Sequence, residues 1–216
     1  MENVTVLGAG SWGTALAIVL AENGHNTLLW THREDQAAEI NNSHTNRKYL
    51  PETVLPTGLR ATVSLEEAVA HAKTIVVAVP TKAIREVCGN VSNLLSEAKL
   101  FVHVSKGIEP DTLLRISELM RESIEPQYIE EIVVLSGPSH AEEVVLQHPT
   151  TVSATCTSMD AAKKVQDLFM SQYFRVYTND DVIGVEIGGA LKNVIALAAG
   201  ITDGLEYGDN AKAALI

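Results

Sequence analysis

Residues 4–17, VTVLGAGSWGTALA, join an apolar strand-forming run to a G-x-G-x-x-G turn and an Ala/Leu-rich helical run. In this order Gly8 permits the tight turn, Gly10 lets the backbone approach a pyrophosphate, and Gly13 lets the helix pack closely on the strand. The helix N-terminus after the turn attracts an anion. Clustered glycines alone also occur in structural turns, but a strand before them and a helix after them favour a dinucleotide site.

Strand and helix patterns alternate along most of the chain. Continuous β-branched runs predict strands at 3–8, 26–31, 74–79, 99–104, 131–135, 150–155 and 173–177. Helical periodicity predicts helices at 13–23, 34–42, 64–71, 81–96, 111–124, 138–146 and 159–169. This alternation predicts an α/β fold with a doubly wound, mostly parallel Rossmann-type sheet. Pro80 and Pro110 are expected to begin helices, and residues 43–58 to form a long, functional loop.

The pattern changes after residue 178. A small-residue-rich helical run covers 181–204, and Ala-rich helix resumes at 211–216 without a following Gly cap or Pro. We therefore divide the chain into a dinucleotide-binding domain, residues 1–178, and the start of an all-helical second domain, residues 179–216. We expect the sequence to be a fragment cut inside that second domain.

Composition narrows the class of protein. The net charge of −11 argues against a nucleic-acid surface or an anionic membrane surface as partner. Residues 182–200 are apolar except for Glu186, Lys192 and Asn193, which favours a buried helix of a soluble protein over a membrane span. Cys88 and Cys156 fit a reducing compartment and are read as small buried hydrophobes. We expect a cytoplasmic protein without membrane insertion.

The tip of the second predicted strand bears on cofactor choice. An acidic residue there would bind the ribose 2′-hydroxyl of NAD, whereas this chain has Thr31, His32 and Arg33. A guanidinium matches a 2′-phosphate, which favours NADPH without excluding NADH. The alternative is that Arg33 is a solvated charge at the helix start, paired with Glu34 or Asp35.

Two lysines are candidates for chemistry. Lys106 follows the predicted strand 99–104, at the sheet edge where open α/β folds bind ligands, although a surface lysine is the alternative. Lys192 lies in mid-helix with Gly188 and Gly189 one turn before it. Interior glycines cost a helix about 1 kcal/mol each, so a close approach by a ligand or backbone is expected there.

Lys192 is interpreted as a proton donor or acceptor. A lysine in low-dielectric surroundings has a lowered pKa and can then exchange a proton near neutrality. The alternative is an ion pair between Lys192 and a carboxylate across a domain interface.

A second strand-to-helix turn, SGPSHAEE at residues 136–143, falls at the same edge of the predicted sheet. Ser139 and Glu142 have the spacing of a capping box, and a ligand could share the same helix N-terminus.

Six motifs together resemble bacterial NAD(P)-dependent glycerol-3-phosphate dehydrogenases. They are GAGSWGTALA at 8–17, HR at 32–33, NRKYLP at 46–51, SKGI at 105–108, SGPSHA at 136–141 and GALKNV at 189–194. The resemblance runs in order over essentially the whole chain. It implies reversible reduction of dihydroxyacetone phosphate, a small phosphorylated substrate, to sn-glycerol 3-phosphate, the precursor of phospholipid backbones. It also implies a homodimer at full length.

The resemblance further implies roles for individual residues, and no metal. Beside Gly8, Gly10 and Gly13 of the glycine turn, the cofactor contacts would come from Ser11, Trp12, His32, Arg33, Tyr49, Lys106 and Ala141. The substrate contacts would come from Lys106, Gly137, Ser139 and Lys192. Lys192 would exchange the proton, with Lys106 and Asn193 completing the catalytic set. The Asp, Thr and Arg–Asn residues by which the family binds substrate lie in its second domain, so we expect this fragment to be inactive.

Two other functions stay open from the residues alone. A related Rossmann-type reductase would turn over a small non-phosphorylated hydroxy acid instead. A dinucleotide-binding module would bind NADPH without any turnover.

Overall fold

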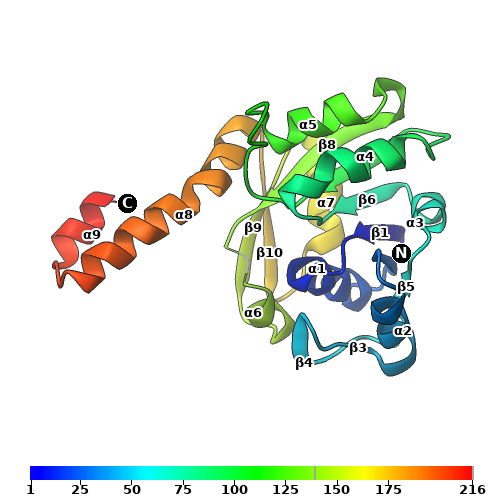
Figure 1. The fold of residues 1–216 in the computed structure, drawn as a ribbon, viewed down its shortest axis with the longest axis horizontal. Helices are drawn as coiled ribbons and strands as arrows, with labels where there is room; N and C mark the ends of the chain where they lie inside the picture. Colours follow the sequence, from blue (N-terminus) through cyan, green and yellow to red (C-terminus); the bar gives the residue numbers. More distant parts are fainter. Residues whose placement is uncertain (139, 216) are drawn as a thin grey trace.

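The computed structural model describes residues 1–138 and 140–215. Within them eight strands form one sheet in the order β10-β9-β8-β7-β6-β1-β2-β5 (Figure 1). The strands are β1 (Asn3–Leu7), β2 (Asn26–Trp30), β5 (Arg60–Thr62), β6 (Thr74–Val77), β7 (Lys99–His103), β8 (Ile129–Ser136), β9 (Thr150–Thr155) and β10 (Phe174–Asn179). Neighbours from β5 to β8 are all parallel, whereas β9 pairs antiparallel with β8 and parallel with β10. The predicted doubly wound, mostly parallel sheet is confirmed.

Helices cover both faces of the sheet. One face carries α1 (Ser11–Glu22), α2 (Glu34–Ser43), α6 (Ala141–Val145) and α7 (Met159–Phe169), and the other carries α3 (Leu65–His71), α4 (Ile84–Ser92) and α5 (Ile116–Ser123). Successive strand side chains point to opposite faces. Val76 therefore packs in the first layer, while Ile75 and Val77 pack in the second. This two-sided burial explains why the strands are apolar at every position.

Three helices are shorter than predicted. A 3₁₀ turn, η1 (Thr81–Ala83), precedes α4, and α6 begins only at Ala141. The predicted helix at 111–124 begins at Ile116, because Leu113 has a φ of 59° that a right-handed helix cannot contain. The prediction that Pro110 starts this helix is therefore wrong. A further 3₁₀ turn, η2 (Pro126–Tyr128), leads into β8.

The segment predicted as a long loop contains regular structure. An antiparallel hairpin, β3 (Thr45–Asn46) and β4 (Leu50–Val54), lies within residues 43–58, and the short edge strand β5 follows it. These strands were missed because they have two, five and three residues, and Pro51 interrupts the usual strand pattern.

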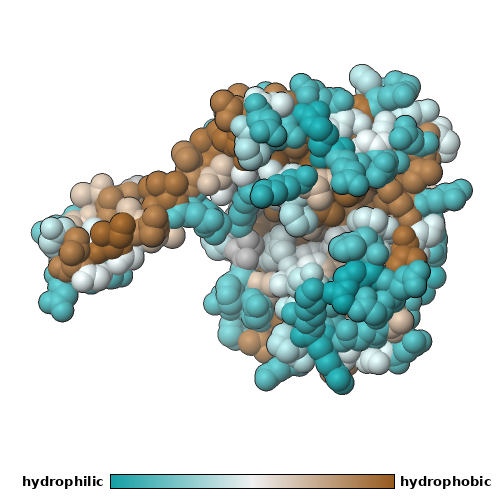
Figure 2. Space-filling view, viewed as in Figure 1, coloured by the Kyte–Doolittle hydropathy of each residue, from teal (hydrophilic) through white to brown (hydrophobic). Residues whose placement is uncertain are grey.

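The last two helices leave the body of the molecule. Figure 1 shows α8 (Val182–Gly204) projecting from the sheet and α9 (Asp209–Leu215) folding back along its far end. The prediction that residues 182–200 are buried is wrong for the described structure, because α8 packs mainly on β8 and α9, and Figure 2 shows its outer part as an exposed apolar surface. Leu197, for example, is 67% exposed. By length and composition α8 could cross a membrane, a weak sign that core helices also give.

Candidate functional site

The glycine turn between β1 and α1 is fixed by packing within the chain. Gly8 has a φ of +114°, and a Cβ there would lie 2.7 Å from the Ala78 carbonyl oxygen. A Cβ at Gly13 would collide with the Gly8 carbonyl oxygen. At Gly10 a Cβ would meet nothing within 4 Å among the described residues. Gly8 and Gly13 thus serve the fold, while Gly10 leaves open space beside the backbone, as a pyrophosphate requires.

A cavity of about 530 Å³ lies against this turn. We call it the glycine-turn cavity; its lining is Gly8, Ala9, Gly10, Ser11, Trp12, Gly13, Trp30, Thr31, His32, Gln36, Tyr49, Ala78, Val79, Pro80, Thr81, Val104, Ser105 and Lys106. It lies at the carboxyl ends of β1, β2, β6 and β7, where the strand order reverses and open α/β sheets bind ligands. The N-cap of α1 is Gly10, which has no side chain to accept a hydrogen bond from the first amides of the helix. These amides therefore suit an anion.

The structure gathers most of the predicted cofactor residues around this cavity. Gly8, Gly10, Ser11, Trp12, Gly13, His32, Tyr49 and Lys106 all line it. Ala141 does not; it is buried at the start of α6. Arg33 also lies outside the lining.

The Arg33 side chain pairs with Asp35. Its Nε donates to Asp35 Oδ1 at 3.0 Å, and its Nη2 pairs with Asp35 Oδ2. The hydrogen bond to Asp35 raises the pKa of Arg33 and lowers that of Asp35. This is one of the two pairs in the alternative interpretation, and the cofactor contact of Arg33 stays a prediction.

A buried polar network behind the turn was not predicted. Gln36 Nε2 donates to the Ala9 carbonyl oxygen at 2.7 Å and to Asn46 Oδ1 at 3.0 Å. Thr31 Oγ1 donates to Gln36 Oε1 at 2.6 Å, and Asn46 Nδ2 donates to Thr14 Oγ1 at 2.9 Å. The network ties the turn, α2 and the β3–β4 hairpin into one unit. The signal available in sequence was Asn46 at the head of the NRKYLP motif.

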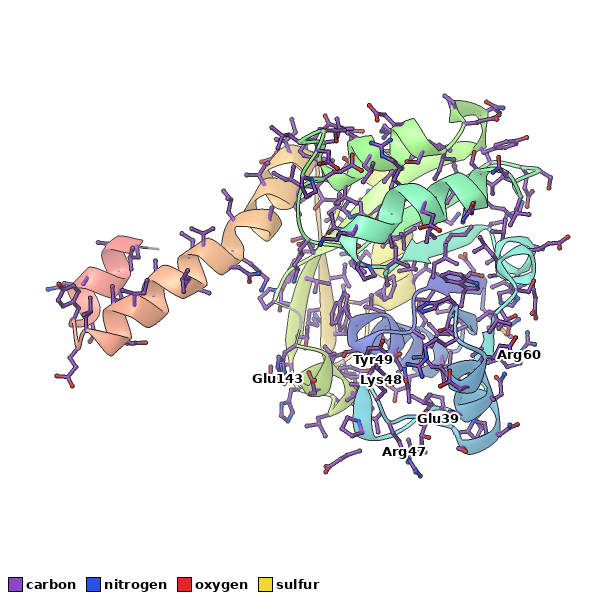
Figure 3. The ribbon with its side chains drawn as sticks, in the orientation of Figure 1. Glu39, Arg47, Lys48, Tyr49, Arg60 and Glu143 are labelled. Carbon is purple, nitrogen blue, oxygen red and sulfur yellow. The ribbon has the colours of Figure 1, made fainter. Side chains whose placement is uncertain are left out.

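The β3–β4 hairpin places one residue in the cavity lining and a lysine beside that residue. Tyr49 is half-buried and lines the cavity, and Lys48 Nζ lies 5.4 Å from the centre of its ring. The Arg47 amide donates to Glu39 Oε1 on α2 at 2.8 Å, which fixes the base of the hairpin; Figure 3 labels these four residues. In a chain of net charge −11, a local cation such as Lys48 favours the binding of an anionic ligand.

Lys106 connects the glycine-turn cavity to the turn after β8. It is half-buried, and its Nζ donates to the Gly137 carbonyl oxygen at 2.9 Å. Burial and the nearby charge of Lys192 both lower the pKa of Lys106. Gly137 must be glycine, since a Cβ there would lie 2.8 Å from the Thr151 carbonyl oxygen. The structure therefore brings together Lys106 and Gly137, two of the predicted substrate residues.

Lys192 lies on the exposed part of α8, with Asn193 beside it. The expected close approach occurs at Gly189, where a Cβ would lie 3.7 Å from Lys106 Cγ and 3.3 Å from Ser136 Oγ. At Gly188 a Cβ would meet nothing within 4 Å in the described part of the chain. The low-dielectric surroundings expected for Lys192 are not formed by residues 1–138 and 140–215, and its catalytic role stays a prediction.

The remaining predicted features have mixed outcomes. Ser139 lies outside the described residues, so its capping and substrate roles stay predictions. Cys88 and Cys156 are buried as expected, and burial raises the pKa of Cys88 to about 12. The boundary between residues 178 and 179 also stays a prediction; β10 ends at Asn179 and α8 begins at Val182.

Comparisons with known proteins agree with this arrangement. Residues 3–162 match the family model described as NAD-dependent glycerol-3-phosphate dehydrogenase N-terminus, and residues 181–216 match the corresponding C-terminus. Over all 216 residues the chain is 75% identical to glycerol-3-phosphate dehydrogenase [NAD(P)+] of Lysinibacillus sphaericus, of which it spans 64%. It is 62% identical to the Bacillus subtilis enzyme of the same name and spans 63% of that chain.

A solved structure shows the same fold. The crystal structure of glycerol-3-phosphate dehydrogenase from Coxiella burnetii superposes with a TM-score of 0.89 at 36% identity, covering 99% of this chain and 65% of that one. The two family models together cover most of the chain, including the glycine turn, Lys106 and Lys192. The chain belongs to the NAD-dependent glycerol-3-phosphate dehydrogenase family.

Proposed function

We propose that this chain forms the nucleotide-binding part and the first substrate-domain helix of an enzyme that reduces dihydroxyacetone phosphate to sn-glycerol 3-phosphate with NADPH. The position of Lys106 carries the proposal. Its side chain lines the glycine-turn cavity, holds the Gly137 carbonyl and lies against α8 at Gly189. One ammonium thus borders both the nucleotide cavity and the helix that bears Lys192.

The site fits a dinucleotide. Gly10 leaves open space at the N-terminus of α1, and the cavity continues from this turn past Tyr49 to Lys106. When bound, the nicotinamide supplies the hydride. Lys106 and Lys192 orient the substrate carbonyl and stabilise the negative charge that develops on its oxygen. Lys192 donates the proton to that oxygen in reduction and accepts it in oxidation.

NADPH is the proposed cofactor, with NADH as a second. Arg33, directly after β2, and Lys48, beside the cavity residue Tyr49, would supply positive charge near the end of the cavity beyond β2, where the ribose 2′ position lies in Rossmann folds. The product would serve glycerophospholipid synthesis in the cytoplasm, and the complete enzyme would act as a homodimer.

Turnover by two proteins tests the proposal. The first is the 216-residue chain; the second, here the extended chain, joins residue 216 to the segment that follows the matching position in the Lysinibacillus sphaericus relative. Both are expected to bind NADPH. The extended chain should oxidise NADPH with dihydroxyacetone phosphate, and the 216-residue chain should do so poorly, because it leaves Lys192 exposed.

Three outcomes would contradict the proposal. Full turnover by the 216-residue chain would show that the active site is complete without any residue packed over α8. Turnover of a non-phosphorylated keto acid, with none on dihydroxyacetone phosphate, would indicate the hydroxy-acid reductase. NADPH binding without any turnover by the extended chain would indicate a binding module.

A further inference from the structure

Glu186 is the one buried residue of α8, a helix whose other residues are half-buried or exposed. Its side chain is 2% exposed, although the rest of α8 between Val182 and Gly204 is half-buried or fully exposed. The carboxylate is charged, and placing it in an apolar interior without partners would cost several kcal/mol. Its partners therefore decide where this end of α8 lies.

Three residues from two other elements surround the carboxylate. Oε2 accepts from Arg115 Nη1 at 2.5 Å and from Ser117 Oγ at 2.7 Å. Oε1 accepts from the Ser117 amide at 2.7 Å, so Glu186 satisfies a free N–H in the first turn of α5. His103 Nε2, at the end of β7, lies 3.1 Å from Oε1 without the alignment of a full hydrogen bond.

The electrostatics agree with the geometry. Burial works to raise the pKa of Glu186, but His103 and Ser117 outweigh it and hold the pKa at about 2. The carboxylate is thus fully ionised at neutral pH. A buried ion with this many donors fixes orientation more strictly than apolar contact does, because moving the helix would leave the charge without partners.

The carboxylate of Glu186 joins the segment that leads to Lys106 to the helix that carries Lys192. His103 precedes Lys106 by three residues on the β7 side, and Glu186 precedes Gly189 by one helical turn on α8. A Cβ at Gly189 would lie 3.7 Å from Lys106 Cγ, so the helix backbone passes close to the Lys106 side chain, and Lys192 follows one turn later. The contact between Glu186 and β7–α5 is therefore the fixed point from which α8 reaches Lys106.

We propose that Glu186 is a positioning residue that sets the direction of α8 and so places Lys192 opposite Lys106. The proposal rests on the proposed function, in which both lysines act on one carbonyl. Among residues 1–138 and 140–215, Glu186 does not line the glycine-turn cavity, and its carboxylate bonds to Arg115 and Ser117 and to neither lysine; it acts through the helix.

Steady-state kinetics of the extended chain give the first test. Glu186→Gln keeps the shape of the side chain and removes its charge. Its kcat is expected to fall by about 10²-fold, the effect of a misplacement near 1 Å, while the NADPH dissociation constant stays within about twofold. The matched control is Glu118→Gln, which takes away another carboxylate from Arg115, 2.7 Å from its Nη2, without reaching α8. Its kcat should be unchanged.

A titration of the 216-residue chain gives a second test that needs no activity. The pKa of Lys106, followed by NMR of labelled lysine, is expected to rise in Lys192→Met because a neighbouring positive charge is gone. Glu186→Gln should raise it by a smaller amount, because Lys192 moves but keeps its charge, and adding Glu186→Gln to Lys192→Met should raise it no further. This readout decides the inference even if the extended chain proves inactive on dihydroxyacetone phosphate, a result that would count against the proposed function alone.

A milder variant covers the case in which Glu186→Gln does not fold. Ser117→Ala deletes one donor to the carboxylate and leaves the amide contact. It should shift kcat and the Lys106 titration in the same direction by a smaller factor. A folded Glu186→Gln or Ser117→Ala protein with wild-type kcat and a wild-type Lys106 titration overturns the proposal. So does a loss of NADPH affinity that matches the loss of kcat.

Discussion

The helices α1 and α8 are both apolar and contain glycine, but they are held in place by different forces. α1 is buried from Gly13 to Leu20 between the sheet and its neighbouring helices, so many small apolar contacts together fix its position. In α8 the buried residue is Glu186, and one polar cluster fixes the helix at its base. Similar hydropathy therefore led to opposite burial, and the first three of the four predictions below probe that difference.

The largest expected effect is on turnover at Lys192. In the extended chain Lys192→Ala should lower the rate by about 10²–10⁴, because proton transfer and charge stabilisation are both lost. NADPH affinity should be nearly unchanged. Lys192→Arg should not restore activity, since a guanidinium is not deprotonated.

Lys212→Ala serves as the control, because it deletes another lysine of the projecting segment, one paired with Asp203. A well-folded Lys192→Ala protein that keeps more than about a tenth of the wild-type rate would exclude the catalytic role. A lower melting temperature with proportionate losses of binding and rate would point to a structural role instead.

The glycines of the two helices should respond in opposite directions. Gly13→Ala forces a methyl group onto the Gly8 carbonyl and should cost on the order of 3 kcal/mol of the free energy of unfolding. Gly188→Ala adds a methyl group in open space and should stabilise α8 by about 0.5–1 kcal/mol. Urea unfolding and hydrogen exchange in α8 measure the two effects. Destabilisation by Gly188→Ala would mean that α8 is covered in solution.

Acid should weaken the attachment of α8. The folded pKa of Glu186, about 2, is below its ordinary value of 4.5, so the contribution to stability is complete above pH 4.5 and is lost as pH falls toward 2. The groups facing this carboxylate are His103, Arg115 and Ser117. Arg115 also donates a hydrogen bond to Glu118. The full contribution is about 3 kcal/mol.

The difference in unfolding free energy between wild type and Glu186→Gln, measured from pH 2 to 7, isolates this carboxylate from the others. It should shrink through the acidic half of that range. A difference that does not change with pH would show that Glu186 is not held as a buried anion.

The smallest expected effect concerns the cofactor end of the site. Arg33→Ala should weaken NADPH binding about tenfold and NADH binding less, because NADPH alone carries the 2′-phosphate. Asp35→Asn should favour NADPH, since Asp35 occupies the guanidinium in the structure. Glu34→Gln, a neighbouring exposed carboxylate, is the control for net charge. Calorimetric titration of the 216-residue chain with each cofactor makes the comparison. Equal losses of affinity for both cofactors would show that Arg33 does not contact the 2′-phosphate.

Local patterns predicted most of the body of the molecule. Strand runs and helical periods located the long strands and most helices, and the glycine spacing located the turn that the cavity surrounds. The hairpin β3–β4 and strand β5 were missed, since two to five residues at an edge carry too little periodicity. The helix expected at 111–124 was placed too early, because a single positive φ at Leu113 leaves no pattern in sequence.

The sequence by itself determined the mostly parallel sheet, the glycine turn and the lysines worth testing, because these depend on local periodicity and on glycine stereochemistry. The tertiary structure alone decided that Arg33 pairs with Asp35, that Gln36 and Asn46 brace the turn, and that Glu186 meets His103, Arg115 and Ser117. These contacts join residues as much as 83 positions apart, as between His103 and Glu186. A single polar residue in an apolar helix shows that a partner is required, but only the folded chain shows which donors lie close enough to provide it.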